Sequence, residues 1–260
     1  MRRSTRIILW IAAACGVGTA AWVAISSPRA GLDRSFERRY PGAARTFQTR
    51  PVMPAIPTDR DGLEAYVTVE PQDYSAWFRL AYRRRWQGDV EGAEQAFRTA
   101  SECAAQASAA YPDAPYPSFV RGYVRQELGQ RAEARRFFAE AAALYERHLA
   151  NPDWESNPTP WLNLGWCRRH LGDERGAHGA WTRAVLAAEA RLTPGDPVSL
   201  FNLACYRALA GRRDGALDAL RQSIAAGWND RELTLNDDDL ASLRDDAAFA
   251  EMAQRIVKQP

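Results

Sequence analysis

One four-position pattern recurs four times along the chain and constrains its fold more than any other feature. Each copy has a glycine followed by a small residue at +5, a large apolar residue at +9 and a small residue at +12. Positions +5 and +9 are about one helical turn apart and face the same neighbour, while a glycine suits the end of a preceding helix. The pattern therefore predicts a repeated helical hairpin. The copies are Gly88/Ala93/Phe97/Ala100, Gly129/Ala134/Phe138/Ala141, Gly172/Ala177/Trp181/Ala184 and Gly211/Ala216/Leu220/Ser223.

A single hairpin of this kind cannot bury its own apolar face, so consecutive hairpins must stack into a solenoid. The chain has 260 residues, of which 46% are apolar and 25% charged, values that are ordinary for a globular protein with a real core. We expect an all-α solenoid. The usual product of such a fold is a surface for partners, not a catalytic pocket.

Charge is distributed unevenly between the start of the chain and the repeats. Residues 1–60 hold ten arginines against three acids, a net charge of +7, which leaves −5 for residues 61–260 because the whole chain carries +2. Phosphate binding needs a contiguous cationic face. The acidic repeat region therefore argues against a nucleic-acid partner.

An uncharged apolar stretch of 19 residues, Ile7 to Ile25, follows three arginines at the N-terminus. As a helix it would span roughly 28 Å, the thickness of a bilayer's hydrocarbon core. It predicts a membrane anchor over residues 1–26, with a cleaved signal peptide or a lipoprotein modified at Cys15 as alternatives. The short basic N-terminus favours an N-inside arrangement that places the repeats outside the cytoplasm, although five arginines that follow the span compete with it.

Residues 27–58 are rich in proline and arginine and show little apolar periodicity. Such a composition predicts an extended tether between the anchor and the repeats. Its arginines are interpreted as part of a solvated linker close to anionic lipid headgroups, with a specific binding motif as the alternative.

Tracing each glycine backwards locates the first helix of its hairpin and a family resemblance. Residues 161–165 read Trp-Leu-Asn-Leu-Gly, the W-x-x-L-G opening of a tetratricopeptide repeat, and residues 88–97 have the form of that repeat's second half. Pro71 and Pro194 stand at the family's inter-repeat proline position. The chain thus resembles a tetratricopeptide repeat protein. The resemblance implies a right-handed solenoid of about four repeats over residues 59–226, with a C-terminal capping segment at 227–260.

Two departures from the family pattern are visible. The glycines stand 41, 43 and 39 residues apart (88 to 129, 129 to 172 and 172 to 211), against about 34 in the family. We expect lengthened second helices or connecting loops, with extra turns in 100–110 and 139–148.

The second departure is an arginine in place of the family's tyrosine, at Arg84, Arg125, Arg168 and Arg207. These arginines are expected to pair with acids of adjacent hairpin turns, and the alternative is an anion-binding row. The acids considered are Asp89, Glu133, Asp173, Glu174 and Asp214.

In tetratricopeptide repeat proteins the first helices line a concave groove, and the resemblance places mainly aromatic residues there. Rigid aromatic side chains would anchor an extended or helical peptide, and interleaved arginines would bind its carboxylates. The alternative is that these aromatic residues are buried as core. The expected groove residues are Phe78, Tyr82, Arg85, Phe119, Tyr123, Gln126, Leu162, Trp166, Arg169, Phe201 and Cys205.

Other residue types give no sign of a catalytic or metal site. Cys15, Cys103, Cys167 and Cys205 are widely spaced and indicate buried free thiols, with a Cys167–Cys205 bridge as the alternative. The three histidines have no paired nucleophile, and the acidic triplet 237–239 lacks the glycine and distal glutamate of a calcium loop. Capping of a terminal helix by Asp238 or Asp239 is the preferred interpretation of the triplet.

The sequence as a whole predicts a membrane-tethered adaptor or scaffold, not an enzyme. We expect a protein or peptide partner, membrane contact through residues 7–25, no cofactor, no nucleic acid and no small-molecule substrate. Two alternatives remain open: a secreted or periplasmic solenoid that self-associates, and a non-catalytic accessory subunit of an envelope enzyme complex.

Overall fold

The computed structural model describes residues 56–256, and every regular element in that range is a helix. The expected all-α hairpin solenoid is confirmed. None of the helices in this range combines the length and the apolar character needed to cross a bilayer. The predicted anchor at residues 7–25 lies outside the described residues, as does most of the predicted linker.

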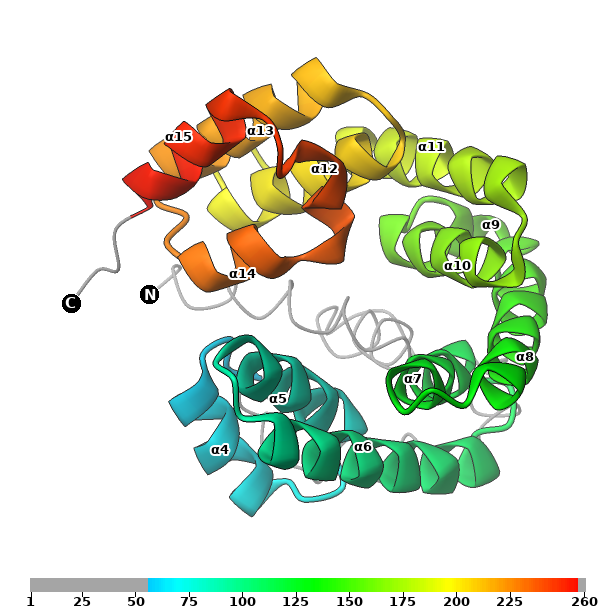
Figure 1. The fold of residues 1–260 in the computed structure, drawn as a ribbon. Helices are drawn as coiled ribbons and strands as arrows, with labels where there is room; N and C mark the ends of the chain where they lie inside the picture. The colour runs from blue at the N-terminus through cyan, green and yellow to red at the C-terminus, as the bar shows by residue number, and fades with distance from the viewer. Residues whose placement is uncertain (1–55, 257–260) are drawn as a thin grey trace, which may run out of the picture.

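Four consecutive hairpins form the body of the molecule. They curve into a nearly closed ring, in which the first helix of each hairpin lies on the inner side and the second helix on the outer side (Figure 1). The hairpins are α5 (Tyr74–Trp86) with α6 (Val90–Ala110), α7 (Pro115–Glu127) with α8 (Arg131–Leu149), α10 (Pro158–Leu171) with α11 (Glu174–Ala190), and α12 (Pro197–Leu209) with α13 (Arg213–Ala225).

Aspartate residues cap the N-termini of several of these helices, and the pattern glycines lie in the turns between the two helices of each hairpin. The Asp89 carboxylate accepts the Gly92 N–H at 3.0 Å, and the Asp173 carboxylate accepts the Gly176 N–H at 2.8 Å. Each bond satisfies a backbone donor that the first helical turn leaves without a partner. All four pattern glycines have φ between 68° and 90°, a region that side chains other than glycine rarely adopt. The hairpin turns are therefore where the pattern predicted them.

Inside each hairpin, a small residue of the first helix faces the large +9 residue of the second. A Cβ atom on Gly165 would lie 2.2 Å from Nε1 of Trp181, and one on Gly122 would lie 2.8 Å from the Phe138 ring. The first and fourth hairpins have alanine at the equivalent small position, Ala81 and Ala204. The smallest residue thus meets the largest ring, so that the two helices approach closely.

The extra length of the repeats lies in the second helices, as predicted. The first helices have 13 or 14 residues, whereas α6 has 21, α8 has 19 and α11 has 17. The segments 100–110 and 139–148 belong to α6 and α8. A short helix, α9 (Pro152–Glu155), occupies the connection between the second and third hairpins.

A helix that the glycine pattern does not predict, α4 (Arg60–Val69), precedes the first hairpin. Its buried side chains Leu63, Tyr66 and Val67 form an apolar cluster with Leu80 of α5. Their i, i+3, i+4 spacing is the sequence signal that could have located this helix. It covers the open face of α5 and so caps the N-terminal end of the solenoid.

Three short helices follow the last hairpin: α14 (Arg231–Asn236), the 3-10 helix η3 (Asp238–Leu243) and α15 (Ala247–Arg255). Phe249 and Met252 of α15 are buried in the apolar cluster of the fourth hairpin. The capping expectation needs a correction, because the carboxylate that caps η3 belongs to Asp237, which accepts the Asp239 N–H at 3.0 Å. Asp238 and Asp239 are instead the first residues of η3.

Candidate functional site

The predicted groove residues lie on the four inner helices. Phe78, Tyr82 and Arg85 are on α5, and the equivalent positions of the next hairpins follow on α7, α10 and α12. Figure 1 shows these four helices around the centre of the ring. The structure therefore brings to one curved surface a set of residues that the sequence distributes over about 130 positions.

The aromatic members of this set contact one another. Phe78 lies 5.1 Å from Tyr82 and 6.0 Å from Tyr123 between ring centroids, and Tyr123 lies 4.9 Å from Phe119 and 6.3 Å from Trp166. The contacts are edge-to-face, the arrangement that aromatic quadrupoles favour. The rings thus form a continuous network across three hairpins and contribute to packing between repeats.

Exposure divides the aromatic set in two. Phe119 and Phe201 are buried, with 6% and 2% of their surface exposed, so the core interpretation applies to them. Phe78, Tyr82, Tyr123 and Trp166 are half-buried. Burial raises the pKa of both Tyr82 and Tyr123 above the ordinary phenol value, which keeps both hydroxyl groups protonated and able to donate hydrogen bonds.

The fourth hairpin's part of the groove is covered by the chain itself. The indole ring of Trp228 stacks on Phe201 with centroids 4.0 Å apart and an interplanar angle of 15°. The Cys205 thiol is 3% exposed, and burial raises its pKa. Leu162 packs half-buried against the same apolar cluster. Sequence reasoning missed this cover, although Trp228 is a large apolar residue next to a helix end.

The polar groove residues differ in how far they are engaged. The Arg85 guanidinium forms an ion pair with Glu127 and also lies 5.8 Å from the centre of the Phe97 ring. The Arg169 guanidinium lies 5.4 Å from the centre of the Trp166 ring and 5.9 Å from the centre of the Trp181 ring. Gln126 is exposed. The expected use of Arg85 as a carboxylate receptor therefore competes with an acid of the chain.

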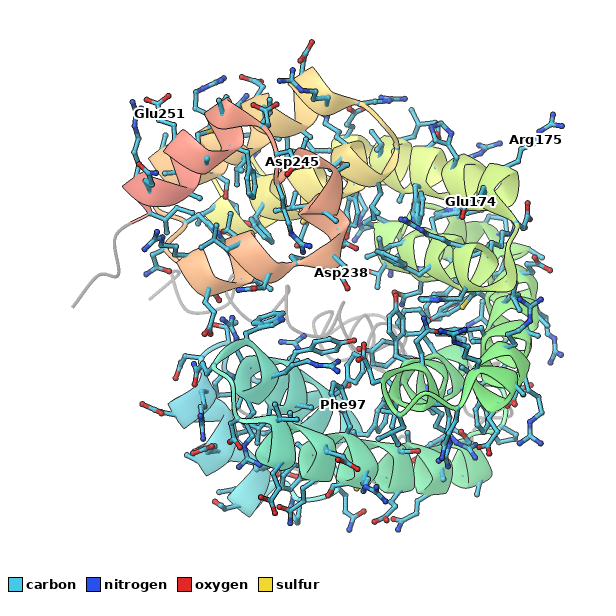
Figure 2. All side chains as sticks on the ribbon, viewed as in Figure 1. Phe97, Glu174, Arg175, Asp238, Asp245 and Glu251 are labelled. Carbon is cyan, nitrogen blue, oxygen red and sulfur yellow. The ribbon has the colours of Figure 1, made fainter. Side chains whose placement is uncertain are left out.

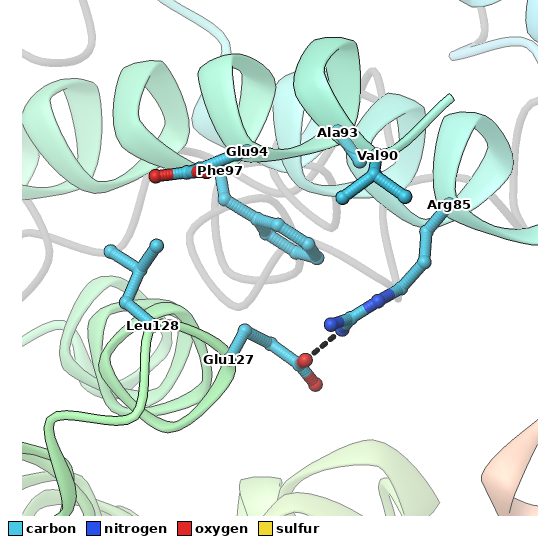
Figure 3. Close-up of a pocket in the computed structure, with 7 residues that line it drawn as sticks. All are labelled: Arg85, Val90, Ala93, Glu94, Phe97, Glu127 and Leu128. Carbon is cyan, nitrogen blue, oxygen red and sulfur yellow. Dashed lines mark hydrogen bonds and ion pairs between the residues drawn. The ribbon is translucent and has the colours of Figure 1, made fainter. Parts of the chain in front are cut away.

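A pocket of about 280 Å³ lies at the junction of the first two hairpins. Figure 3 shows the Arg85–Glu127 ion pair, which joins the end of α5 to the end of α7, beside the Phe97 ring. The pocket combines one aromatic face with charges of both signs. Its lining consists of Arg85, Val90, Ala93, Glu94, Phe97, Glu127 and Leu128.

Three potential metal ligands meet where η3 touches α12. Within residues 56–256, the Cys205 thiol and the carboxyl groups of Asp237 and Asp239 are the one group whose ligand atoms all lie within 4.8 Å. Burial raises the pKa of Asp237 to about 6 and that of Asp239 well above its usual value. Burial therefore favours the neutral form of both acids relative to exposed carboxyl groups. Asp239 Oδ1 accepts the Trp166 Nε1–H at 2.7 Å and Asp237 Oδ1 accepts the Asp239 N–H at 3.0 Å, so both carboxyl groups have hydrogen-bond partners within the chain.

The four arginines at the family's tyrosine position, Arg84, Arg125, Arg168 and Arg207, are called the arginine ladder. They lie where neighbouring hairpins meet. Three of the four arginines pair with a glutamate of the preceding outer helix, or of α4 in the case of the first, and each also donates to a carbonyl oxygen eight residues further along its own hairpin. The pairs are Arg84–Glu64 at 3.2 Å, Arg168–Glu146 at 2.9 Å and Arg207–Glu189 at 3.0 Å. These arginines therefore hold two consecutive repeats together.

The expected acids of the hairpin turns are only partly the partners. Glu133 does pair with Arg125 at 3.1 Å, and Asp89 lies 3.9 Å from Arg84. Asp173 instead caps α11, and no ion pair to the ladder is formed by Glu174 or Asp214 in the described part of the chain. The sequence signal that was missed is a glutamate 18 to 22 residues before the arginine.

The three histidines take part in packing and backbone contacts. The His170 ring stacks on Phe138 with centroids 4.2 Å apart, and burial lowers its pKa to about 4. His178 Nε2 lies 3.1 Å from the carbonyl oxygen of Ala210, and His148 lies against Trp154. Cys103, Cys167 and Cys205 are buried free thiols, in agreement with the preferred interpretation of the sequence.

No family model matches the chain, and no curated protein matches it. Among solved structures, it is similar to a chain of the APC/C hetero-tetramer Cut9-Hcn1, with 18% identity, a TM-score of 0.35 and coverage of 76% of this chain and 39% of that one. It is also similar to PilW, a type IV pilus biogenesis factor, with 21% identity, a TM-score of 0.32 and coverage of 74% and 80%.

A further similar structure is YrrB, described as a TPR protein with an unusual peptide-binding site, with 17% identity, a TM-score of 0.30 and coverage of 75% and 90%. The chain spans 39% of the length of the Cut9-Hcn1 chain. Its all-helical hairpin fold follows from the helices and contacts described above, not from these superpositions.

Proposed function

We propose that this chain is a membrane-tethered scaffold that binds a protein or peptide on the inner surface of its first two hairpins. The observation that carries the proposal is the half-buried aromatic surface of Phe78, Tyr82 and Tyr123, next to exposed Gln126 and the pocket beside Phe97. Aromatic side chains of this kind bury much area at a small cost in conformational entropy. A partner would extend the edge-to-face network across the groove.

The tether belongs to the same proposal and is supported by the sequence of residues 7–25. In the proposed arrangement this segment spans the membrane, the arginine-rich residues 27–58 set the reach, and the repeats lie on the extracytoplasmic side. The scaffold then recruits its partner near the membrane surface. Its role is docking, with no chemistry of its own.

Site-specific photocrosslinking in the producing cells tests the groove. A photoreactive amino acid replaces Gln126, exposed on the inner helix α7, and in a matched control it replaces Arg183, exposed on the outer helix α11. We expect a discrete crosslinked species from position 126 that is absent from position 183. Equal crosslinking from both positions would contradict a groove-specific partner, and a crosslink to a second copy of the chain would favour self-association instead.

The tether is tested separately by membrane fractionation. The full-length chain should stay in the membrane after alkaline carbonate washing. Protease added to cells whose inner membrane is intact and accessible from the extracytoplasmic side should digest the repeats. Replacing Ala14 and Val17 by arginine should release the protein, because charged side chains at the centre of a span cost about 2.5 to 3.5 kcal/mol each. A wild-type protein found in the carbonate supernatant would rule out the anchor.

A further inference from the structure

The segment after the last hairpin returns along the inner side of the ring. We call residues 228–243, which include α14 and η3, the C-terminal strap. In Figure 1, α14 lies beside the fourth hairpin, on its inner side, and faces α5 of the first hairpin. Figure 2 shows Asp238 at the inner rim, whereas Arg175 points outward from the far edge. The strap therefore lies between the two ends of the solenoid.

One side of the strap is packed into the groove of the third and fourth hairpins. Trp228 stacks on Phe201, and Asp239 accepts a hydrogen bond from the Trp166 indole at 2.7 Å. Leu240 and Leu243 of η3 are fully buried in the apolar cluster of the fourth hairpin. The strap thus occupies, by stacking and hydrogen bonding, the aromatic positions that a bound peptide would use.

The other side of the strap reaches the first hairpin through Arg83 of α5. Arg83 is 5% exposed, and its guanidinium donates to the carboxylates of Asp230 and Glu232, which lie 147 and 149 residues away. Gln87 adds a hydrogen bond to Glu232 at 3.1 Å. These contacts join the first hairpin to α14 and close the ring.

The closure differs in kind from the contacts between repeats. Successive hairpins bury apolar surface, whereas charged and amide side chains make the hydrogen bonds and ion pairs between α5 and α14. A guanidinium stays charged when it is removed from water, so it is costly to keep buried without its carboxylates. Elements with little apolar contact are the first to open in native proteins. We therefore expect the α5–α14 junction, which depends on Arg83, to open before the contacts between repeats.

From this geometry we propose that the C-terminal strap is a built-in groove ligand and that Arg83, Asp230 and Glu232 form a clasp that holds it closed. The closed clasp keeps the strap over the third and fourth hairpins and narrows entry to the first two. Opening of the clasp exposes the whole aromatic surface to a partner. The regulatory part of this inference rests on the proposed scaffold function, while the clasp itself does not.

The distance between the two ends of the full-length protein, in detergent or nanodiscs, tests the clasp. Spin labels replace Glu91 at the start of α6 and Glu251 of α15, both exposed. The wild type should give one narrow distance population, and Arg83→Met should shift it to longer, broader distances. Hydrogen exchange of residues 231–243 should become at least tenfold faster. Arg98→Met, which removes an exposed ion pair with Glu94, should change neither.

A second variant protects the test against misfolding. Asp230 also caps α14 by accepting the Leu233 N–H, and Asp230→Asn removes its charge while keeping an oxygen that can cap. It should open the ring in the same direction, with the helix content unchanged by circular dichroism. An unchanged distance distribution in both folded variants would overturn the clasp.

The same variants distinguish the clasp from the proposed function. With the photoreactive residue at position 126, Arg83→Met should increase partner crosslinking several-fold. Opening without any crosslinked partner in either form would support the clasp and refute the scaffold function. Opening with equal crosslinking in both forms would show that the strap does not compete with a partner, which would overturn the regulatory part.

Discussion

Adding one methyl group at Gly165 should destabilise the protein, even though alanine is a better helix former than glycine. The added Cβ atom would lie 2.2 Å from Nε1 and 2.4 Å from Cδ1 of Trp181, more than 1 Å inside an ordinary contact of about 3.5 Å. The indole cannot move away easily, because its N–H donates to the Leu162 carbonyl oxygen at 3.3 Å and its ring makes a T-shaped contact with Trp166. The two helices of the third hairpin must therefore separate.

The expected magnitude follows from two opposing terms. Replacing glycine by alanine inside a helix gains about 0.5 to 1 kcal/mol, whereas overpacking costs about 1 to 3 kcal/mol. With an overlap this large we expect the upper part of that range, a net loss of about 2 kcal/mol. For a domain of this size, this corresponds to a fall in Tm of about 4 to 8 °C.

Gly179 provides the matched control within the same hairpin. It lies in the exposed middle of α11, and a Cβ atom there would meet no other atom within 4 Å. Gly179→Ala should raise Tm slightly, by the propensity term alone. Thermal melting followed by circular dichroism measures both variants. If Gly165→Ala raised Tm as Gly179→Ala does, the close packing of glycine against indole would be refuted.

A double-mutant cycle sharpens the same prediction. The first hairpin pairs alanine with phenylalanine at these positions, Ala81 and Phe97. In a Trp181→Phe background, Gly165→Ala should therefore cost about 1 to 2 kcal/mol less than it does alone. Additive effects would show that the two positions do not touch.

Three further predictions concern the core, the strap and the thiols. Ala177→Leu should lower stability by about 1 to 3 kcal/mol, since Ala177 is fully buried between hairpin helices; exposed Ala139→Leu is the control, and an equal Tm for the two would mean that the register is wrong. Burial raises the pKa of Asp237 to about 6, above its unfolded value of about 3.9. Protonation of Asp237 therefore stabilises the docked strap at low pH, and this stabilisation is lost as the pH rises through about 6. Hydrogen exchange of 238–243, corrected for intrinsic rates, should accelerate between pH 5 and pH 7.5 in the wild type and much less in Asp237→Asn; equal profiles would contradict this titration. Cys167 and Cys205 should react with iodoacetamide only after unfolding, because both are buried and their pKa values are raised; rapid alkylation of the folded protein would show that these helices open.

The arginine ladder shows which side-chain contacts the repeat pattern predicts and which it does not. The sequence predicts that Arg84, Arg125, Arg168 and Arg207 are equivalent, and the structure gives three of them equivalent partners. The fourth, Arg125, pairs within its own hairpin, because residues 103–107, at the offset where a glutamate would stand, include no acid. A glutamate 18 to 22 residues before the arginine identifies the correct partner. Using this spacing requires knowing which outer helix packs against each inner helix.

The groove was harder to predict than the fold. The positions of its residues follow from the repeat register, and the structure brings them to one surface. Their exposure does not follow from the register, because it depends on chain more than 20 residues away: Trp228 stacks on Phe201, and the Tyr145 ring packs against Phe119. Whether an aromatic residue is an anchor for a partner or part of the core is therefore a property of the assembled ring.

What the sequence by itself determined is the set of hairpins: where they turn, which side chains interlock inside them, and which helices are lengthened. These features depend on interactions within about 20 residues, namely glycine conformation, helix capping and the match between a small and a large residue. The tertiary structure alone decided that the ring closes, because the Arg83 clasp joins residues 147 positions apart that no periodicity relates. Local backbone chemistry repeats along the chain and can be read from it, whereas a single long-range ion pair leaves no repeating signal.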